Sequence, residues 1–278
     1  MIVVVGGGTM GGGIAVSFAL AGQRVRVVEH TPELAEAADA RIRASLERAV
    51  GKRDRADELA DIAALLSIDT EHPDPANVEL LIEALPEDLA LKRSVLATID
   101  AHYCSNGELL IGSNTSSLPI TELATAVDAP ERFCGMHFFN PVPASQLVEI
   151  VVGTETSPET TDRAAAYGEL LGLTPIVVSD SPGFASSRLG VTLGLEAIRM
   201  VEAGVASAED IDAAMTLGYK HPIGPLRLTD LVGVDVRLAI AEHLATELGE
   251  RFAPPQLMVD MVSDGRLGKK TGEGFYVW

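Results

Sequence analysis

The stretch Val3-Val4-Val5-Gly6-Gly7-Gly8-Thr9-Met10-Gly11 joins a short apolar run to a second apolar run that continues through Ala21. Its glycines follow the spacing G-x-G-x-x-G. In this motif Gly6 permits a tight turn, Gly8 lets the backbone approach a pyrophosphate, and Gly11 permits close packing of a helix on a strand. The pattern predicts a buried strand, a phosphate-binding loop and a helix, in that order.

A second predicted strand, Val25 to Val28, ends at Glu29, which follows Gly11 by 18 residues. A ribose-binding carboxylate belongs at this point of a dinucleotide-binding unit. Thr9 and Met10 open the predicted helix, where the N–H groups and the helix dipole face phosphates. A glycine motif alone is weak evidence, but the strand, loop, helix and acid together indicate a dinucleotide site. Glu29 repels a 2′-phosphate, which favours NAD over NADP.

Predicted strands and helices alternate through the first 180 residues. Further strands are expected at Val78–Ala84, Leu109–Ile111 and Pro175–Val178, with helical segments between them. This alternation predicts an α/β fold, a Rossmann-type doubly wound parallel sheet with helices on both faces. Ligands of such sheets bind beyond the carboxyl ends of the strands.

The periodicity after Ser181-Pro182-Gly183 is purely helical. We therefore expect two domains, an NAD-binding Rossmann domain at residues 1–181 and an all-helical C-terminal domain at residues 182–278. A helical domain beside a nucleotide-binding domain commonly closes the cleft over the substrate. Its helices are predicted at Phe184–Glu202, Ala208–Leu217, Leu228–Leu248 and Pro255–Val262.

Composition narrows the class of protein. The 278 residues are 47% hydrophobic, and the net charge is −19. That charge argues against nucleic acid as a partner, and no apolar run reaches the length of a membrane span. The N-terminus lacks a signal-peptide pattern, and two cysteines, Cys104 and Cys134, fit a reducing cytoplasm. No ligand cluster has the spacing of a metal site.

One segment reverses the charge of the chain. Between Arg41 and Arg55 six residues are basic and two are acidic. If one helix persists, Arg41, Ser45, Arg48, Lys52 and Arg55 lie on a single face of it. Such a stripe is either a solvated face or a dock for a polyanion such as coenzyme A.

A second candidate site lies between Ser113 and Glu149. His137 stands among apolar residues and is followed by Asn140, two prolines and a strand-like run, 146–148, that ends at Glu149. A histidine with a carboxylate on one nitrogen and a substrate hydroxyl on the other is a general-base arrangement. The alternative is a core histidine that a backbone carbonyl satisfies.

Several motifs resemble one known family, the 3-hydroxyacyl-CoA dehydrogenases, including bacterial 3-hydroxybutyryl-CoA dehydrogenases. The motifs are S-N-T-S-S-L at 113–118, G-M-H-F-F-N-P-V-P at 135–143 and L-V-E-I-V at 147–151. The match extends from Val3 to G-K-K-T-G-E-G-F-Y at 268–276. The resemblance implies a homodimer that uses NAD to oxidise an L-3-hydroxyacyl-CoA, such as 3-hydroxybutyryl-CoA, to the 3-ketoacyl-CoA.

The resemblance also implies roles for single residues. His137 takes the proton of the 3-hydroxyl, Glu149 orients the imidazole, and Ser116 and Asn140 hydrogen-bond the reacting oxygens. Ser45 and Lys52 match positions that contact coenzyme A. The residues that match cofactor contacts of the family are Glu87, Lys92, Ser116 and Lys270, in addition to Gly6, Gly8, Thr9, Met10, Gly11 and Glu29. Taken alone, Glu87 and Lys92 are equally well explained as a surface charge pair, and Lys270 as part of a solvated basic tail.

One position departs from the family pattern. The family motif P-G-F-x-x-N-R reads Pro182-Gly183-Phe184-Ala185-Ser186-Ser187-Arg188 here, so Ser187 stands near the substrate where many members have Asn. Two alternatives to the predicted function remain open. One is a dehydrogenase of a free hydroxy acid or a carnitine-like substrate, which needs no basic dock. The other is an NAD-binding structural protein, which needs no His–Glu pair.

Overall fold

The computed structural model describes residues 1–53 and 56–278, and it divides into two units, Met1–Ser181 and Pro182–Trp278. Arg55, which belongs to the predicted basic stripe, lies outside the described residues. The first unit contains a sheet in the order β3-β2-β1-β4-β5-β6-β7-β8. The strands are β1 (Ile2–Val5), β2 (Val25–Val28), β3 (Leu66–Asp69), β4 (Leu80–Glu83), β5 (Leu110–Ser113), β6 (Phe133–Phe138), β7 (Leu147–Val152) and β8 (Thr174–Ser179).

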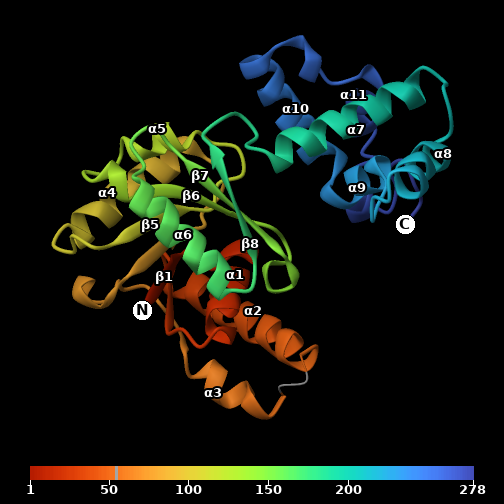
Figure 1. Ribbon diagram of the computed structural model, residues 1–278. Helices are drawn as coiled ribbons and strands as arrows, with labels where there is room; N and C mark the ends of the chain where they lie inside the picture. The colour runs from red at the N-terminus through yellow and green to blue at the C-terminus, as the bar shows by residue number, and fades with distance from the viewer. Residues whose placement is uncertain (54–55) are drawn as a thin grey trace. The chain divides into compact units, whose positions relative to one another are not determined.

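The order of the strands is that of a doubly wound sheet, because β2 and β3 lie on one side of β1 and β4 to β8 lie on the other. Figure 1 shows this sheet among the helices of the first unit. Neighbouring strands from β3 to β6 are parallel, as are β7 and β8. The predicted Rossmann-type fold is therefore confirmed. One detail differs from a fully parallel sheet, because β7 runs antiparallel to β6. The eight residues between them, 139–146, are too few for the crossover helix that a parallel connection needs.

Helices of the first unit cover the sheet. They are α1 (Thr9–Leu20), α2 (Pro32–Gly51), α3 (Leu59–Ala63), α4 (Leu89–Tyr103), α5 (Ile120–Ala124) and α6 (Pro158–Leu170). Every residue of α1 from Gly11 to Leu20 is buried, which explains why this helix is apolar on all sides. Helix α1 packs against α2, and the Phe18 ring meets the Tyr167 ring of α6 with centroids 6.1 Å apart.

Side chains at the helix starts fix where α2 and α4 begin. Thr31 accepts a hydrogen bond from the N–H of Leu34, and Asp88 accepts one from the N–H of Leu91. Both are N-cap residues that satisfy an N–H group left without a partner by the helix. Short 3₁₀ turns connect the other elements at Ala56–Glu58, Pro75–Asn77, Pro130–Arg132 and Val142–Ala144.

The second unit is helical, as the sequence predicts. Its elements are α7 (Ser186–Glu202), α8 (Ala208–Ala213) with a π-helical extension (Ala214–Gly218), α9 (Pro225–Val232), α10 (Val234–Leu248), α11 (Gln256–Ser263), and 3₁₀ turns at Glu250–Phe252 and Lys269–Thr271. The single helix expected at Leu228–Leu248 is wrong. Gly233, with φ of 108°, breaks it into α9 and α10.

The described residues contain no helix that is both long and apolar enough to cross a membrane. Among the same residues, no three His, Cys, Asp or Glu side chains gather closely enough to hold a metal ion. Cys104 is exposed and Cys134 is buried in β6, and both are free thiols. Burial raises the pKa of the Cys134 thiol to about 12.

Candidate active site

The glycine loop between β1 and α1 has the geometry of a phosphate cradle. Gly6 has φ of 95°, which favours glycine. A Cβ on Gly11 would overlap the carbonyl oxygen of Gly6, so the helix reaches the loop only because Gly11 has no side chain. A Cβ on Gly8 would meet no atom within 4 Å, so space lies open in front of Gly8. Thr9 and Met10 follow as the first residues of α1. These residues fit the pyrophosphate of NAD.

Two charged side chains bind the backbone of Gly7, one at its N–H and one at its carbonyl oxygen. Glu29, just after β2, accepts a hydrogen bond from the Gly7 N–H through Oε1, at 2.6 Å. Arg41 of α2 donates from Nη1 to the Gly7 carbonyl oxygen, also at 2.6 Å. The sequence places Glu29 correctly beside the loop. It gives no sign that this carboxylate and Arg41 also fix the loop itself.

His137 and Glu149 face each other across the antiparallel pair β6–β7, where they are register partners. The His137 Nδ1 lies 2.7 Å from Glu149 Oε2. His137 is 6% exposed and Glu149 is 0% exposed. A carboxylate on Nδ1 holds the ring proton there in the neutral tautomer, which leaves Nε2 as the basic nitrogen. The partner of Nδ1 is thus a carboxylate, whereas the core-histidine alternative expects a backbone carbonyl.

The end of β6 is also fixed by a residue that the sequence analysis missed. Asn114, 8% exposed, accepts a hydrogen bond from the Phe138 N–H through Oδ1, at 2.9 Å. It therefore ties the start of the S-N-T-S-S loop to the residue after His137. Beyond β6, Phe139 stacks at a tilt on the imidazole with centroids 4.5 Å apart. Asn140 follows and is exposed.

Ser116 lies in the loop after β5, whose backbone is bound by Glu87. The Glu87 Oε1 accepts from the N–H of Ser116 at 2.8 Å, from the N–H of Ser117 at 2.9 Å and from Thr115 Oγ1 at 2.8 Å. Lys92 is fully buried, so a surface charge pair with Glu87 is a wrong interpretation. Its Nζ donates to Glu83 Oε1 at 2.7 Å and lies 3.7 Å from Glu87 Oε2. Glu83 was not singled out in the sequence.

A groove of about 490 Å³ brings the basic stripe to the other predicted site segments. Thr9, at the start of α1, and Asn140 both line it. Ser45 and Lys52 both line it, so the predicted helical face is turned toward the groove. The remaining lining residues are Gly12, Gly13, Arg41, Arg48, Ala49, Arg53, Pro141, Val142, Pro143 and Ala144.

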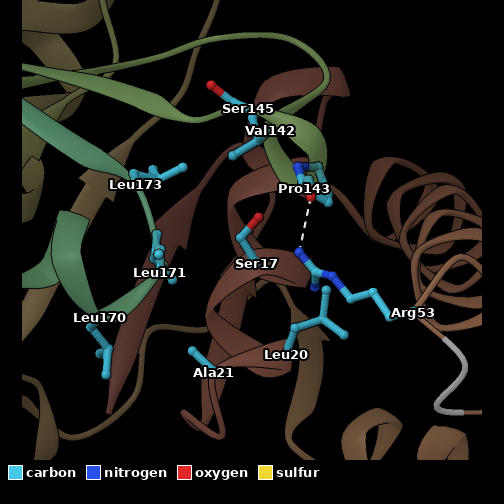
Figure 2. Close-up of a pocket in the computed structure, with 11 residues that line it drawn as sticks. Ser17, Leu20, Ala21, Arg53, Val142, Pro143, Ser145, Leu170, Leu171 and Leu173 are labelled. Carbon is cyan, nitrogen blue, oxygen red and sulfur yellow. Dashed lines mark hydrogen bonds between the residues drawn. The ribbon is translucent and has the colours of Figure 1, made fainter.

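A smaller cavity of about 300 Å³ adjoins this groove (Figure 2). Its lining includes Leu20 of α1, Leu170 at the end of α6, and Leu171 and Leu173 of the turn that follows, together with Ser17 and Ser145. Arg53, Val142 and Pro143 line both spaces. The Arg53 Nη2 donates to the Pro143 carbonyl oxygen at 3.0 Å, so this guanidinium lies at the boundary between the groove and the cavity.

Two predicted site residues belong to the helical unit. Ser187 lies in the first turn of α7 and is half-buried. Lys270 is exposed in a 3₁₀ turn, and its Nζ donates to Asp235 Oδ2 at 2.6 Å. The tail beyond Lys270 is held by Asp230, which accepts hydrogen bonds from the N–H groups of Phe275 and Tyr276, each at 2.9 Å.

Comparison with known proteins identifies the family. Models of the 3-hydroxyacyl-CoA dehydrogenase NAD binding domain and C-terminal domain match residues 1–181 and 183–278, respectively. The chain belongs to the 3-hydroxyacyl-CoA dehydrogenase family. The family predicted from the sequence, its class as a dehydrogenase and NAD as its cofactor are thus confirmed.

Members of this dehydrogenase family resemble the chain over its whole length. The 3-hydroxybutyryl-CoA dehydrogenase of Mycobacterium tuberculosis is 43% identical over 99% of this chain and 97% of that protein. The enzyme of the same name from Clostridioides difficile is 40% identical over 99% and 98%. The crystal structure of (S)-3-hydroxybutyryl-CoA dehydrogenase PaaH1 from Ralstonia eutropha superposes with a TM-score of 0.93 at 40% identity, covering 100% of this chain and 98% of that one.

The second and third glycines of the motif, Gly8 and Gly11, make a matched pair of variants. Gly8→Ala is expected to keep the melting temperature of the wild type, because φ of −62° suits alanine and the space around Gly8 is open. The added methyl group occupies that open space, so the affinity for NADH should fall by about tenfold or more, as measured by fluorescence titration. Gly11→Ala should instead lower the melting temperature, because the Cβ overlaps Gly6. Unchanged NADH affinity in Gly8→Ala would contradict the assignment of the cradle.

Proposed function

We propose that the chain oxidises a short L-3-hydroxyacyl-CoA, such as 3-hydroxybutyryl-CoA, to the 3-ketoacyl-CoA with NAD, and runs in reverse with NADH. The hydrogen-bonded pair of His137 and Glu149 carries this proposal. The names of the relatives from Mycobacterium tuberculosis, Clostridioides difficile and Ralstonia eutropha support the acyl group.

In the proposed reaction His137 is the general base. Its Nε2 takes the proton of the 3-hydroxyl, and NAD, when bound, would accept the hydride from the same carbon. Glu149, buried against Nδ1, stabilises the imidazolium that forms. Such proton transfer contributes about 10²–10⁴-fold to a rate. When bound, NAD supplies the hydride acceptor, and the protein supplies binding and orientation.

Ser116 and Asn140 are proposed to donate hydrogen bonds to the oxygens of the acyl group. Both are exposed, and both follow strand ends at the carboxyl edge of the sheet. Donors aimed at an oxygen that gains charge lower the barrier, because they need no reorganisation during the reaction.

We propose that the groove lined by the basic stripe binds the phosphates of coenzyme A. Arg41, Arg48, Lys52 and Arg53 all line it, inside a chain with a net charge of −19. A polyanion requires such local positive charge. Ser45 lies on the same wall and offers a hydroxyl to the ligand. A free hydroxy acid or a carnitine-like substrate would not explain the basic groove. A structural protein that only binds NAD would not explain the His137–Glu149 pair.

We further propose a cytoplasmic homodimer that acts in fatty acid metabolism, with the helical unit contributing to substrate binding and to the subunit interface. The helical unit exposes large apolar side chains. Leu189 and Leu193 lie one turn apart on α7, and Leu231, Val232 and Val236 lie around the junction of α9 and α10. Clusters of exposed apolar side chains are typical of protein interfaces.

The base is tested by His137→Ala. This variant should lose about 10²–10⁴-fold in kcat while its NADH affinity stays that of the wild type, because the imidazole acts only in the chemical step. NADH oxidation is followed at 340 nm with acetoacetyl-CoA, longer 3-ketoacyl-CoAs and free acetoacetate. Near-normal turnover in His137→Ala would refute the proposed base. Wild-type activity on acetoacetate alone would refute the CoA thioester.

The groove is tested by Lys52→Glu with two substrates. The variant should raise KM for acetoacetyl-CoA by about tenfold, roughly 1.4 kcal/mol, because it replaces an attraction to phosphate with a repulsion. Acetoacetyl-pantetheine lacks the nucleotide phosphates, so its KM should change little. Arg43→Gln on α2 removes a positive charge that does not line the groove and serves as the control. Equal effects of Lys52→Glu on both substrates would mean that the stripe is a solvated face.

The departure at Ser187 is tested by restoring the asparagine of the family. Serine keeps one donor and its acceptor sites, and a bridging water replaces the longer reach of the amide. Ser187→Asn should therefore change kcat/KM for acetoacetyl-CoA by about tenfold at most, or about 1.4 kcal/mol. A wild type that is inactive on every CoA thioester, together with activity in Ser187→Asn, would show that the serine marks a different substrate.

A further inference from the structure

Glu83 and Lys92 form an ion pair that is entirely buried. Both side chains are 0% exposed, and Lys92 Nζ donates to Glu83 Oε1 at 2.7 Å. The ammonium also donates to the Leu85 carbonyl oxygen at 3.0 Å. Protein atoms therefore enclose the Lys92 ammonium, and its partners are a carboxylate and a backbone carbonyl.

The pair joins three elements at the carboxyl edge of the sheet. Glu83 is the last residue of β4, Ser113 is the last residue of β5, and Lys92 lies in the first turn of α4. Ser113 Oγ donates to Glu83 Oε2 at 2.5 Å, and the Leu85 N–H donates to Glu83 Oε1 at 2.6 Å. Glu83 therefore uses both carboxylate oxygens to hold the ends of two neighbouring strands.

A second carboxylate extends this arrangement to the loop that carries Ser116. Glu87 Oε2 lies 3.7 Å from Lys92 Nζ, while its Oε1 accepts from the N–H of Ser116 at 2.8 Å. Ser117 donates to the same oxygen through its N–H at 2.9 Å and its Oγ at 3.0 Å. Lys92 thus attracts the carboxylate that fixes the backbone of Ser116.

We propose that Glu83 and Lys92 are positioning residues, whose buried ion pair sets the place of Ser116 through Glu87. The inference rests on the proposed function, in which Ser116 binds the reacting oxygens. Neutral side chains of similar volume can fill the same core, since a buried ion pair is not needed for stability alone. They cannot attract the Glu87 carboxylate. Folding and positioning can therefore be separated by mutation.

The test compares Lys92→Met with the double variant Glu83→Gln/Lys92→Met. The single variant leaves a buried carboxylate without its cation and should have the lower melting temperature. The double variant should recover most of the wild-type melting temperature. Its kcat with acetoacetyl-CoA at saturating NADH should nevertheless stay about tenfold or more below the wild type, with the NADH dissociation constant changed by less than about threefold.

Two results with the double variant would overturn the proposal. Wild-type kcat would mean that the pair only fills the core. A weakened NADH affinity with unchanged kcat at saturation would mean that Lys92 binds the cofactor. If the double variant does not fold, Ser113→Ala decides, because it removes a single hydrogen bond to Glu83. Reduced kcat with unchanged NADH affinity in Ser113→Ala supports the proposal, and unchanged kcat overturns it.

A coupling measurement shows whether the effect passes through Ser116. Ser116→Ala is made in the wild type and in the double variant. If the pair positions Ser116, the substitution should lower kcat much less in the double variant, since the hydroxyl is already misplaced there. Equal effects in both backgrounds would overturn the proposal.

The control for a general loss of stability is Thr160→Val. Thr160 is buried at the start of α6 and donates to the Glu131 carbonyl oxygen at 2.8 Å, away from the strand ends that carry the site. It should lower the melting temperature and leave kcat unchanged. A wild type inactive on acetoacetyl-CoA contradicts the proposed function. An active wild type whose network variants behave like Thr160→Val contradicts this inference alone.

Discussion

The antiparallel pairing of β6 with β7 fixes the position of the His137 imidazole relative to the Glu149 carboxylate. The two residues are register partners, so their side chains emerge on the same face of the sheet. A shift of the pairing by one residue would turn Glu149 to the opposite face. The short connection at 139–146 forces the chain to reverse here, and the same connection carries Asn140 and the wall of the basic groove. One change of strand direction thus supplies the proposed base, its partner and part of the ligand groove.

Local patterns were enough to predict the parts of the molecule that depend on neighbours in the sequence. The G-x-G-x-x-G motif and the acid at Glu29 give the first strand, helix and second strand, because each glycine has a steric reason for its place. The break at Gly233 was missed, since hydrophobic periodicity continues from α9 into α10 and only the backbone angle ends the helix. The reversal at β7 was also missed, because an apolar strand has the same pattern in either direction.

The candidate-site prediction lacked the residues whose partners are distant in the sequence. The sequence pairs Lys92 with Glu87, because the two are close along the chain. In the structure the nearest carboxylate to Lys92 belongs to Glu83, the last residue of β4. The available signal was a glutamate directly after the apolar run Leu80-Leu81-Ile82. Asn114 and Arg41 gave no such signal. Their partners, the Phe138 N–H and the Gly7 carbonyl oxygen, are backbone groups that the sequence does not reveal.

The two hydrogen bonds to the backbone of Gly7 have a consequence for redesigning the coenzyme preference. An acid after β2 binds the ribose 2′-hydroxyl of NAD and repels the 2′-phosphate of NADP, so a change to NADP requires its replacement. In this chain the same acid, Glu29, also accepts the Gly7 N–H, while Arg41 holds the carbonyl of that residue. A single substitution at Glu29 would make room for the 2′-phosphate. It would also remove the acceptor for the Gly7 N–H and so loosen the loop that binds the pyrophosphate. In this chain a change of coenzyme therefore requires two substitutions. One must accommodate the 2′-phosphate, and the other must restore an acceptor for the Gly7 N–H.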